Sequence, residues 1–311
     1  MNSAPLLEVD GLVVRHRAGA VRFNAVDGVS FTVGRGETVG LVGESGCGKS
    51  TLARALLGLY RPSAGAIRFA GSDVTHASRS RDLSRRLQMV FQDPLLSLNP
   101  RSSIGRIVEE PMAVHRLGSH AERRQKVAAL LRRVGLPEDA AARLPHEFSG
   151  GQRQRVGIAR ALALTPELVV CDEPVSALDL SVQAQILNLL GELQIEFGLS
   201  YLFISHDLGV IHHVARRVLV MYLGRIVEAG PAELLWQSPR HPYTAALLAA
   251  TPGRRRKNPA ARAIAADLPS PVDRPAGCAF FARCPRRQPI CAEQSPALRE
   301  FGDQAVACHF S

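Results

Sequence analysis

The sequence lacks any long hydrophobic run. Arg, Asp, Glu or Pro interrupts each apolar stretch before it reaches the roughly eighteen residues that a membrane-spanning helix needs. The first residues, Met1–Asp10, also lack the basic and apolar regions of an export signal. We therefore expect a chain that does not cross a membrane itself and that acts in the cytosol.

Lysine is scarce, since 35 of the 38 basic residues are Arg, although the net charge is +10. A strong positive charge attracts polyanions, so a nucleic acid or an acidic membrane is one possible partner. Dedicated polyanion sites, however, tend to be clustered, whereas these arginines are scattered and form one short cluster at Arg254–Lys257. We favour a solvated Arg-rich surface and expect no nucleic-acid partner.

Cysteine is also sparse, and no two cysteines have the close spacing of a usual structural zinc site. Cys47 and Cys171 stand alone in apolar surroundings, where a cysteine is usually a small buried hydrophobe. The other cysteines crowd the end of the chain, at Cys278, Cys284, Cys291 and Cys308. In a reducing cytosol such a cluster is more typical of a metal site than of disulfides. An iron–sulfur cluster, zinc, and free or oxidised thiols are all open.

The hydrophobic pattern predicts an α/β fold. Residues 7–15 and 21–33 alternate apolar with polar side chains, which indicates antiparallel strands with one solvated face. Further along, short buried strands alternate with helices, which is typical of a mostly parallel sheet. The strands are expected at 38–42, 166–171, 200–205 and 218–222, and the helices at 50–59, 151–164, 181–197 and 208–215.

A helical insertion is expected at about residues 99–160. Its first part is rich in Arg, residues 121–134 are strongly amphipathic, and Pro100, Pro111 and Pro137 are expected to break helices. From Thr251 onward the composition shifts to Pro, Arg and Ala. We therefore expect an α/β domain over residues 1–250, followed by a linker and a cysteine-bearing extension over residues 251–311.

A glycine-rich segment between a strand and a helix has the P-loop pattern, G-x-x-x-x-G-K-S. Glycines let backbone N–H groups point at phosphate oxygens, Lys49 adds a positive charge, and the Ser50 hydroxyl suits Mg²⁺. The expected nucleotide-binding residues of this segment are Gly43, Glu44, Ser45, Gly46, Cys47, Gly48, Lys49, Ser50 and Thr51.

An apolar strand ends in two carboxylates, Asp172 and Glu173. This geometry suits Asp172 as a Mg²⁺ ligand, directly or through water, and Glu173 as the base that orients and deprotonates the attacking water. These two motifs alone indicate an NTPase, and kinases and GTPases also have them.

The segment Ser149-Gly150-Gly151-Gln152, which follows Phe148, discriminates among these classes. Ser and Gly expose N–H and hydroxyl donors at a helix N-terminus, which suits an anion. The segment resembles the signature of ABC ATPases, although the general family pattern begins with Leu where Phe148 stands. The resemblance implies that the anion is the γ-phosphate of ATP on the opposite subunit, so that two subunits close over two nucleotides.

Other segments follow the order of the same family. Gln92 resembles the glutamine that touches Mg²⁺ and water, Ser176–Asp179 resembles the D-loop, and His206 resembles the switch histidine. The resemblance therefore assigns Glu173, His206 and Gln92 to catalysis, and Ser50, Gln92 and Asp172 to Mg²⁺. The family usually stacks adenine on an aromatic residue after the first strand, where His16 and Phe23 are the candidates.

Longer segments are similar to the oligopeptide, dipeptide and nickel importer ATPases, a narrower group. They are residues 40–54, 91–100, 241–248, 268–271 and 277–285. The resemblance implies an ABC-type P-loop ATPase with a RecA-like core, an antiparallel β subdomain, a helical subdomain and a Cys-containing C-terminal extension. Related members hold a [4Fe–4S] cluster in this extension, which makes the four clustered cysteines candidate ligands.

The resemblance also implies the partners and the location of the chain. It implies an ATPase that powers peptide uptake at the cytoplasmic face of the bacterial inner membrane, docked on two permease subunits. A second related ATPase, or a second copy, would complete the dimer, and an extracytoplasmic binding protein would deliver the solute. The permeases would contact the helical insertion and the region just after Gln92. Uptake of nickel or another small solute is an alternative, as is, more remotely, a non-transport ABC ATPase.

Overall fold

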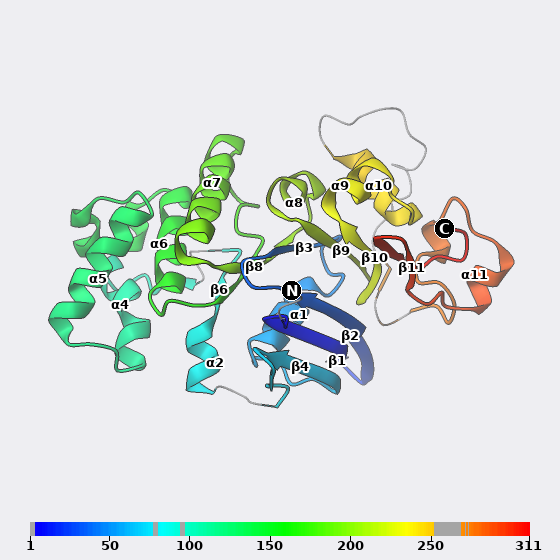
Figure 1. Cartoon of the computed structure of the whole chain (residues 1–311), viewed down its shortest axis with the longest axis horizontal. Coiled ribbons are helices and arrows are strands. Elements are labelled where there is room, and N and C mark those ends of the chain that lie inside the picture. Colours follow the sequence, from blue (N-terminus) through cyan, green and yellow to red (C-terminus); the bar gives the residue numbers. More distant parts are fainter. Residues whose placement is uncertain (1–3, 77–79, 94–96, 252–268, 271, 273) are drawn as a thin grey trace. The chain divides into compact units, whose positions relative to one another are not determined.

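The chain forms two units, one of residues 1–78 and 203–311 and one of residues 79–202. Figure 1 shows the computed structural model, which describes residues 4–76, 80–93, 97–251, 269–270, 272 and 274–311. The cluster Arg254–Lys257 lies outside the described residues, as do the rest of residues 252–268, Pro271 and the segment 94–96 after Gln92.

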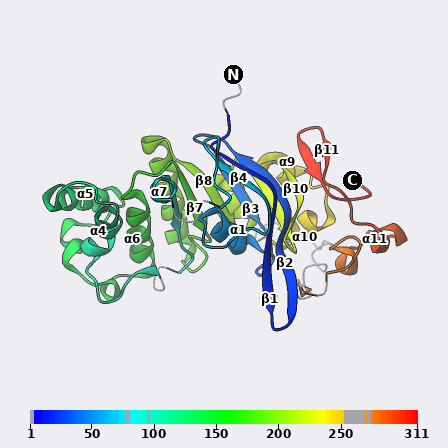
Figure 2. The ribbon, with the colours of Figure 1, turned by 90° about the horizontal axis from the view of Figure 1, so that it is seen from below.

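The first unit begins with an antiparallel sheet. The strands β1 (Leu7–Ala18) and β2 (Val21–Val33) pair along their length, as Figure 2 shows, and β4 (Ala64–Phe69) and β5 (Ser72–Asp73) continue the sheet. The alternation of buried and exposed side chains that predicted the first two strands is confirmed, and β1 extends beyond its predicted end.

The same unit contains a mixed sheet. The fully buried strand β3 (Thr38–Val42) is parallel to β9 (Arg217–Tyr222), and β10 (Arg225–Pro231) is antiparallel to β9. The continuous apolar sequence of β3 fits a parallel strand that is covered on both faces. The first unit also contains the helices α1 (Lys49–Leu56), α8 (Leu208–Val214), α9 (Ala232–Gln237) and α10 (Pro242–Ala250).

The end of the chain adds two strands to this sheet. Strand β12 (Gln304–Val306) pairs with β10, and β11 (Arg299–Phe301) pairs with β12. Before them lie a short 3-10 turn at Phe281–Arg283 and the helix α11 (Pro289–Glu293). The sequence showed no periodicity here because each element is shorter than the window that reveals one.

The second unit holds the helical insertion and a pair of parallel strands, β6 (Leu87–Val90) and β7 (Leu168–Asp172). Figure 1 shows its helices, which are α2 (Arg81–Arg86), α4 (Ile104–Val114), α5 (His120–Arg133), α6 (Gly150–Leu162) and α7 (Leu180–Phe197). Two 3-10 turns lie at Glu138–Ala142 and Pro145–Glu147. Strand β8 (Ser200–Ser205) leads the chain back into the first unit. The predicted helices of this unit are confirmed.

One predicted break is wrong, because Pro111 lies inside α4. A proline there removes one N–H from the helix hydrogen bonds, which disfavours the helix locally. The helix nevertheless continues, since Ile107, Val108 and Met112 are buried around this position. Tertiary packing therefore overrides the local preference. Within the part of the chain that the structure describes, no helix is both long and apolar enough to span a bilayer.

Candidate nucleotide site

The P-loop connects β3 to α1 in a conformation that only glycine fits. Gly48 precedes the first turn of α1 with φ 111°. A Cβ atom at Gly48 would lie 2.3 Å from the carbonyl oxygen of Ala25, and one at Gly43 would lie 2.2 Å from that of Met221. Both neighbours are backbone atoms, so they cannot rotate away. The glycines let the chain approach closely and turn its N–H groups inward.

Lys49 folds back over this loop. Its side-chain Nζ donates to the carbonyl oxygens of Gly43 at 2.7 Å and Glu44 at 3.0 Å, and the residue is 4% exposed. Ser50 and Thr51 follow in the first turn of α1, whose backbone N–H groups point out of the N-terminal end of the helix. A buried ammonium beside such N–H groups is an arrangement that binds phosphate.

Cys47 is buried in the P-loop, as predicted for a small hydrophobic side chain. Burial raises the pKa of its thiol to about 11, although the charge of Lys49 opposes this shift. The thiol therefore stays protonated at neutral pH, and it is no nucleophile.

His16 lies beside the P-loop helix. Its Nε2 is 3.3 Å from the Thr51 hydroxyl, and its ring contacts Tyr60 edge to face at a centroid distance of 4.9 Å. Phe23, the other aromatic candidate for adenine, faces His16 across the β1–β2 pair at 6.1 Å. Both candidates thus share one face of the antiparallel sheet.

In the second unit the two predicted carboxylates end β7. Asp172 and Glu173 are 4% and 8% exposed, and the Nε2 of Gln92 donates to Glu173 Oε2 at 3.1 Å. Glu173 has φ 47°, a left-handed conformation that is uncommon outside glycine and is held only by its surroundings. The Ser176 hydroxyl donates to its carbonyl oxygen at 3.2 Å. The structure therefore brings Gln92, Glu173 and the D-loop together.

The predicted signature begins α6 with a reciprocal cap. Ser149 N–H donates to Gln152 Oε1 at 2.9 Å, and Gln152 N–H donates to Ser149 Oγ at 3.4 Å. Gly151 packs against α7, because a Cβ atom there would lie 2.5 Å from the Val182 side chain. Phe148, which precedes this segment, is buried at 3% exposed.

The site residues are divided between the two units. The P-loop, His16 and the exposed His206, which follows β8, belong to the first unit, whereas Gln92, Asp172, Glu173 and Ser149–Gln152 belong to the second.

Sequence reasoning missed two residues that contact the P-loop. The Glu44 N–H donates to Tyr243 Oη at 2.9 Å, and Arg283 donates to the Glu44 carboxylate. No local signal could reveal these pairs, because they join residues 199 and 239 positions apart in the chain.

The four clustered cysteines line one small cavity of about 10 Å³, together with His241, Phe280 and other residues. Burial, together with the charges of the neighbouring cysteines, raises the pKa of Cys278 to about 11. Thiolates are the ligands that soft metals prefer. Among the residues that the structure describes, however, no three His, Cys, Asp or Glu side chains are arranged to hold a metal ion.

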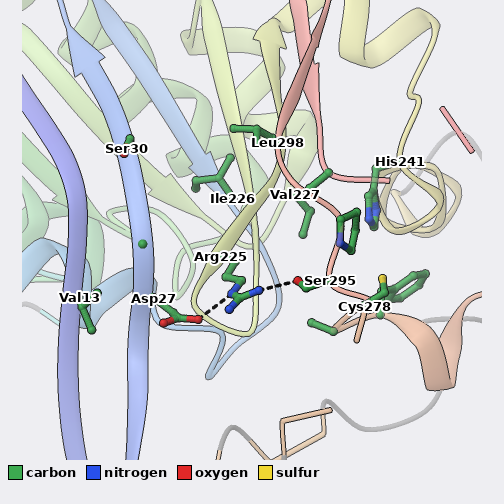
Figure 3. Close-up of a pocket in the computed structure, with 15 residues that line it drawn as sticks. Val13, Asp27, Ser30, Arg225, Ile226, Val227, His241, Cys278, Ser295 and Leu298 are labelled. Carbon is green, nitrogen blue, oxygen red and sulfur yellow. Dashed lines mark hydrogen bonds and ion pairs between the residues drawn. The ribbon is translucent and has the colours of Figure 1, made fainter. Parts of the chain in front are cut away.

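A larger cavity of about 420 Å³ lies in the first unit between β1, β2, β10 and the end of the chain (Figure 3). Arg225 bridges its sides, since its Nε donates to Asp27 Oδ2 at 2.6 Å and its Nη1 donates to Ser295 Oγ at 2.7 Å. Arg274 also pairs with Asp27. This cavity is built around an ion-pair network rather than around the P-loop.

Comparison with known proteins identifies both parts of the chain. The ABC transporter family matches residues 26–176, and the family described as the oligopeptide/dipeptide transporter C-terminal region matches residues 227–291. The chain is 52% identical to the oligopeptide transport ATP-binding protein AppF of Bacillus subtilis (strain 168), over 92% of this chain and 89% of that protein. It is 51% identical to the dipeptide transport ATP-binding protein DppF of Escherichia coli (strain K12), over 91% and 86%.

Solved structures support the same relationship. The ATP-binding cassette MJ0796, a dimer in a post-hydrolysis state bound to ADP and Pi, superimposes with a TM-score of 0.66 at 28% identity, covering 73% of this chain and 98% of that one. The cbiO1 subunit of the Clostridium perfringens transporter complex cbiONQ gives 0.67 at 29%, covering 76% and 92%. The predicted ABC ATPase fold is thereby confirmed. The chain is more than 50% identical to AppF and DppF over more than 90% of its length. It therefore belongs to the ATP-hydrolysing subunits of ABC transporters, in the group with the oligopeptide/dipeptide transporter C-terminal region.

Proposed function

We propose that this chain hydrolyses ATP to power the uptake of oligopeptides or dipeptides through a membrane importer. The observation that carries the mechanism is the hydrogen bond between Gln92 and Glu173 at the buried end of β7. It holds the Glu173 carboxylate in place at the end of the strand. A carboxylate that is held in this way can orient and deprotonate the attacking water, worth about 10²–10⁴ in rate.

Nucleotide binding falls to the P-loop in this proposal. Backbone N–H groups of residues 43–51 hold the phosphates, and the Lys49 ammonium adds the charge that the β- and γ-phosphates attract. His16 is the residue that stacks on adenine, because it lies beside Thr51 at the start of α1. The buried Asp172 and the Ser50 hydroxyl are oxygen ligands of the kind that Mg²⁺ prefers, with Gln92 as a third. Mg²⁺ would neutralise charge on the transferred phosphate.

Ser149–Gln152 complete the site of a second subunit. The cap that starts α6 holds the hydroxyl and N–H groups of this segment at the helix N-terminus, where an anion is favoured. AppF and DppF are named as transport ATP-binding proteins, and MJ0796 is described as a dimer. We extend this arrangement to the present chain, which would form a dimer of two ATPases at the cytoplasmic face of the membrane. Its further partners would be two permease subunits and an extracytoplasmic binding protein. His206 completes the catalytic set as the switch histidine.

We further propose that residues 1–250 form the ATPase domain and residues 251–311 an extension with a structural role. Four thiols around one cavity are the donor set of a [4Fe–4S] cluster. The described side chains are not arranged for coordination, so the cluster stays a prediction that metal analysis tests.

The catalytic proposal is tested by Glu173→Gln. This change keeps the size and the hydrogen bond of the side chain but removes the base. We expect unchanged ATP affinity, a fall in hydrolysis of at least about 100-fold, and a closed ATP-bound dimer in light scattering. Glu192→Gln, at an exposed position of α7, is the matched control and should keep full activity. Wild-type turnover in Glu173→Gln would refute the assignment.

The substrate is tested separately. Purification of the chain from its native membrane with its partners, followed by mass spectrometry of the ligand on the binding protein, should recover peptides. Recovery of nickel or another solute would replace the peptide proposal and leave the ATPase mechanism intact.

A further inference from the structure

An arginine of the C-terminal extension contacts the P-loop directly. Arg283 Nη1 donates to Glu44 Oε1 at 3.0 Å, and its Nη2 donates to Glu44 Oε2 at 2.8 Å. This two-pronged geometry matches the planar guanidinium to the carboxylate. The Arg283 side chain is 5% exposed and that of Glu44 is 20% exposed, so the pair lies largely out of water.

Glu44 is held at its backbone as well as at its side chain. Its N–H donates to Tyr243 Oη at 2.9 Å, and its carbonyl oxygen accepts from Lys49 Nζ at 3.0 Å. One residue therefore connects Arg283 to the ammonium that we assign to the phosphates. A displacement of the Glu44 side chain moves the carbonyl oxygen that orients Lys49.

Buried aromatic side chains surround this contact. Tyr222, Tyr243 and Phe280 are fully buried and pack ring against ring at centroid distances of 4.7, 5.3 and 5.5 Å. The Arg283 guanidinium lies 5.8 Å from the Tyr222 ring centroid and 6.0 Å from that of Phe280. In such surroundings the removal of one partner leaves the other charge buried and uncompensated, unlike the loss of a surface ion pair.

Arg283 also belongs to the cysteine segment. It is adjacent to Cys284, and its N–H donates to the Phe280 carbonyl oxygen at 3.1 Å. Phe280 lines the same cavity as the four cysteines. A change of conformation in this segment would therefore shift Arg283 relative to Glu44.

We propose that Arg283 is a positioning residue for nucleotide binding, through which the conformation of the C-terminal extension sets the affinity of the P-loop for ATP. The inference rests on the proposed nucleotide site and adds a determinant from outside the ATPase motifs. A purely structural role, in which Arg283 only holds the extension in place, would change stability and leave nucleotide affinity untouched.

The test uses the full chain with Arg283→Gln. We expect the affinity for ATP to fall by about three- to thirtyfold, the range for positions that couple to a site without touching its ligand. KM should rise while kcat changes less, because the catalytic carboxylate is not altered. Arg287→Gln is the matched control, since Arg287 is exposed and its Nη1 donates to the carbonyl oxygen of Ala282, within the extension, at 3.3 Å. Arg283→Lys keeps the charge without the fork, so it should recover part of the affinity.

A double-mutant cycle separates direct coupling from general damage. Glu44→Gln combined with Arg283→Gln should cost about as much affinity as either change alone, because the two changes remove one interaction. Additive losses would overturn the proposal, as would a lower unfolding temperature with unchanged ATP affinity in Arg283→Gln.

Two variants keep the result decisive. If Arg283→Gln does not fold, Arg283→Lys keeps the charge and loses the two-pronged contact with the Glu44 carboxylate. A fall in ATP affinity there supports the proposal, and wild-type affinity overturns it. Lys49→Ala tests the nucleotide site itself, separately from the role of Arg283. Unchanged affinity in Lys49→Ala would refute the nucleotide site itself, whereas a loss there with none in Arg283→Gln would refute only the inference.

Discussion

Replacement of Gly48 by alanine would show how closely the P-loop approaches its neighbours. Gly48 has φ 111° and ψ 0°, and a Cβ atom would lie 2.3 Å from the backbone oxygen of Ala25. The unfavourable backbone conformation costs about 1–3 kcal/mol. Overpacking against a neighbour that cannot rotate adds about 1–3 kcal/mol. Together these effects amount to about 2–6 kcal/mol, a large share of the stability of an ordinary protein.

The variant can lower this cost only by moving the P-loop or the strand that holds Ala25. Movement of the loop displaces the N–H groups that would hold the phosphates. Because each 1.4 kcal/mol is about a factor of ten, we expect ATP affinity to fall by at least about tenfold. Isothermal titration measures the affinity, and thermal unfolding measures the stability.

Gly71 provides the matched control for this experiment. It lies in the turn between β4 and β5 with φ 80°, and a Cβ atom there would meet nothing within 4 Å. Gly71→Ala should therefore cost only the backbone term, about 1–2 kcal/mol, and should leave ATP affinity unchanged. Equal stability and equal ATP affinity of Gly48→Ala and the wild type would refute the reasoning.

Two predictions concern the extension and its contacts. Burial alone would raise the pKa of Asp27, but hydrogen bonds from Arg225 and Asn24 and the charges of Arg225 and Arg274 outweigh it and lower the pKa. Stability from this group is present above its unfolded pKa of about 4 and is lost as pH falls through the folded value. Asp27→Asn should therefore cost about 1–3 kcal/mol in urea unfolding at neutral pH, with a smaller difference in acid; a pH-independent difference would contradict this. Anaerobically purified protein should be brown with about four Fe and four sulfide per chain and lose both in Cys284→Ser, whereas colourless protein with stoichiometric zinc would assign the site to zinc.

Much of the fold could be predicted because its cause is local. The alternation that placed β2 at Val21–Val33 and the apolar run that placed β3 at Thr38–Val42 arise from burial of one or both faces of a strand. Motifs are local in the same sense, since the P-loop binds phosphate through groups within nine consecutive residues. The two strands of the C-terminal extension could not be predicted from periodicity, because each is three residues long.

The sequence by itself therefore determined the ATPase class, the P-loop, the acidic end of β7 and the serine that caps α6. Only the tertiary structure decided which distant residues complete them. Gln92 and Glu173 meet across 81 positions and Arg283 and Glu44 across 239. Pro111 remains helical because the residues around it are buried. Periodicity and motif spacing report interactions between neighbours in the chain. The ion pair between Arg283 and Glu44, in contrast, depends on how the whole unit folds.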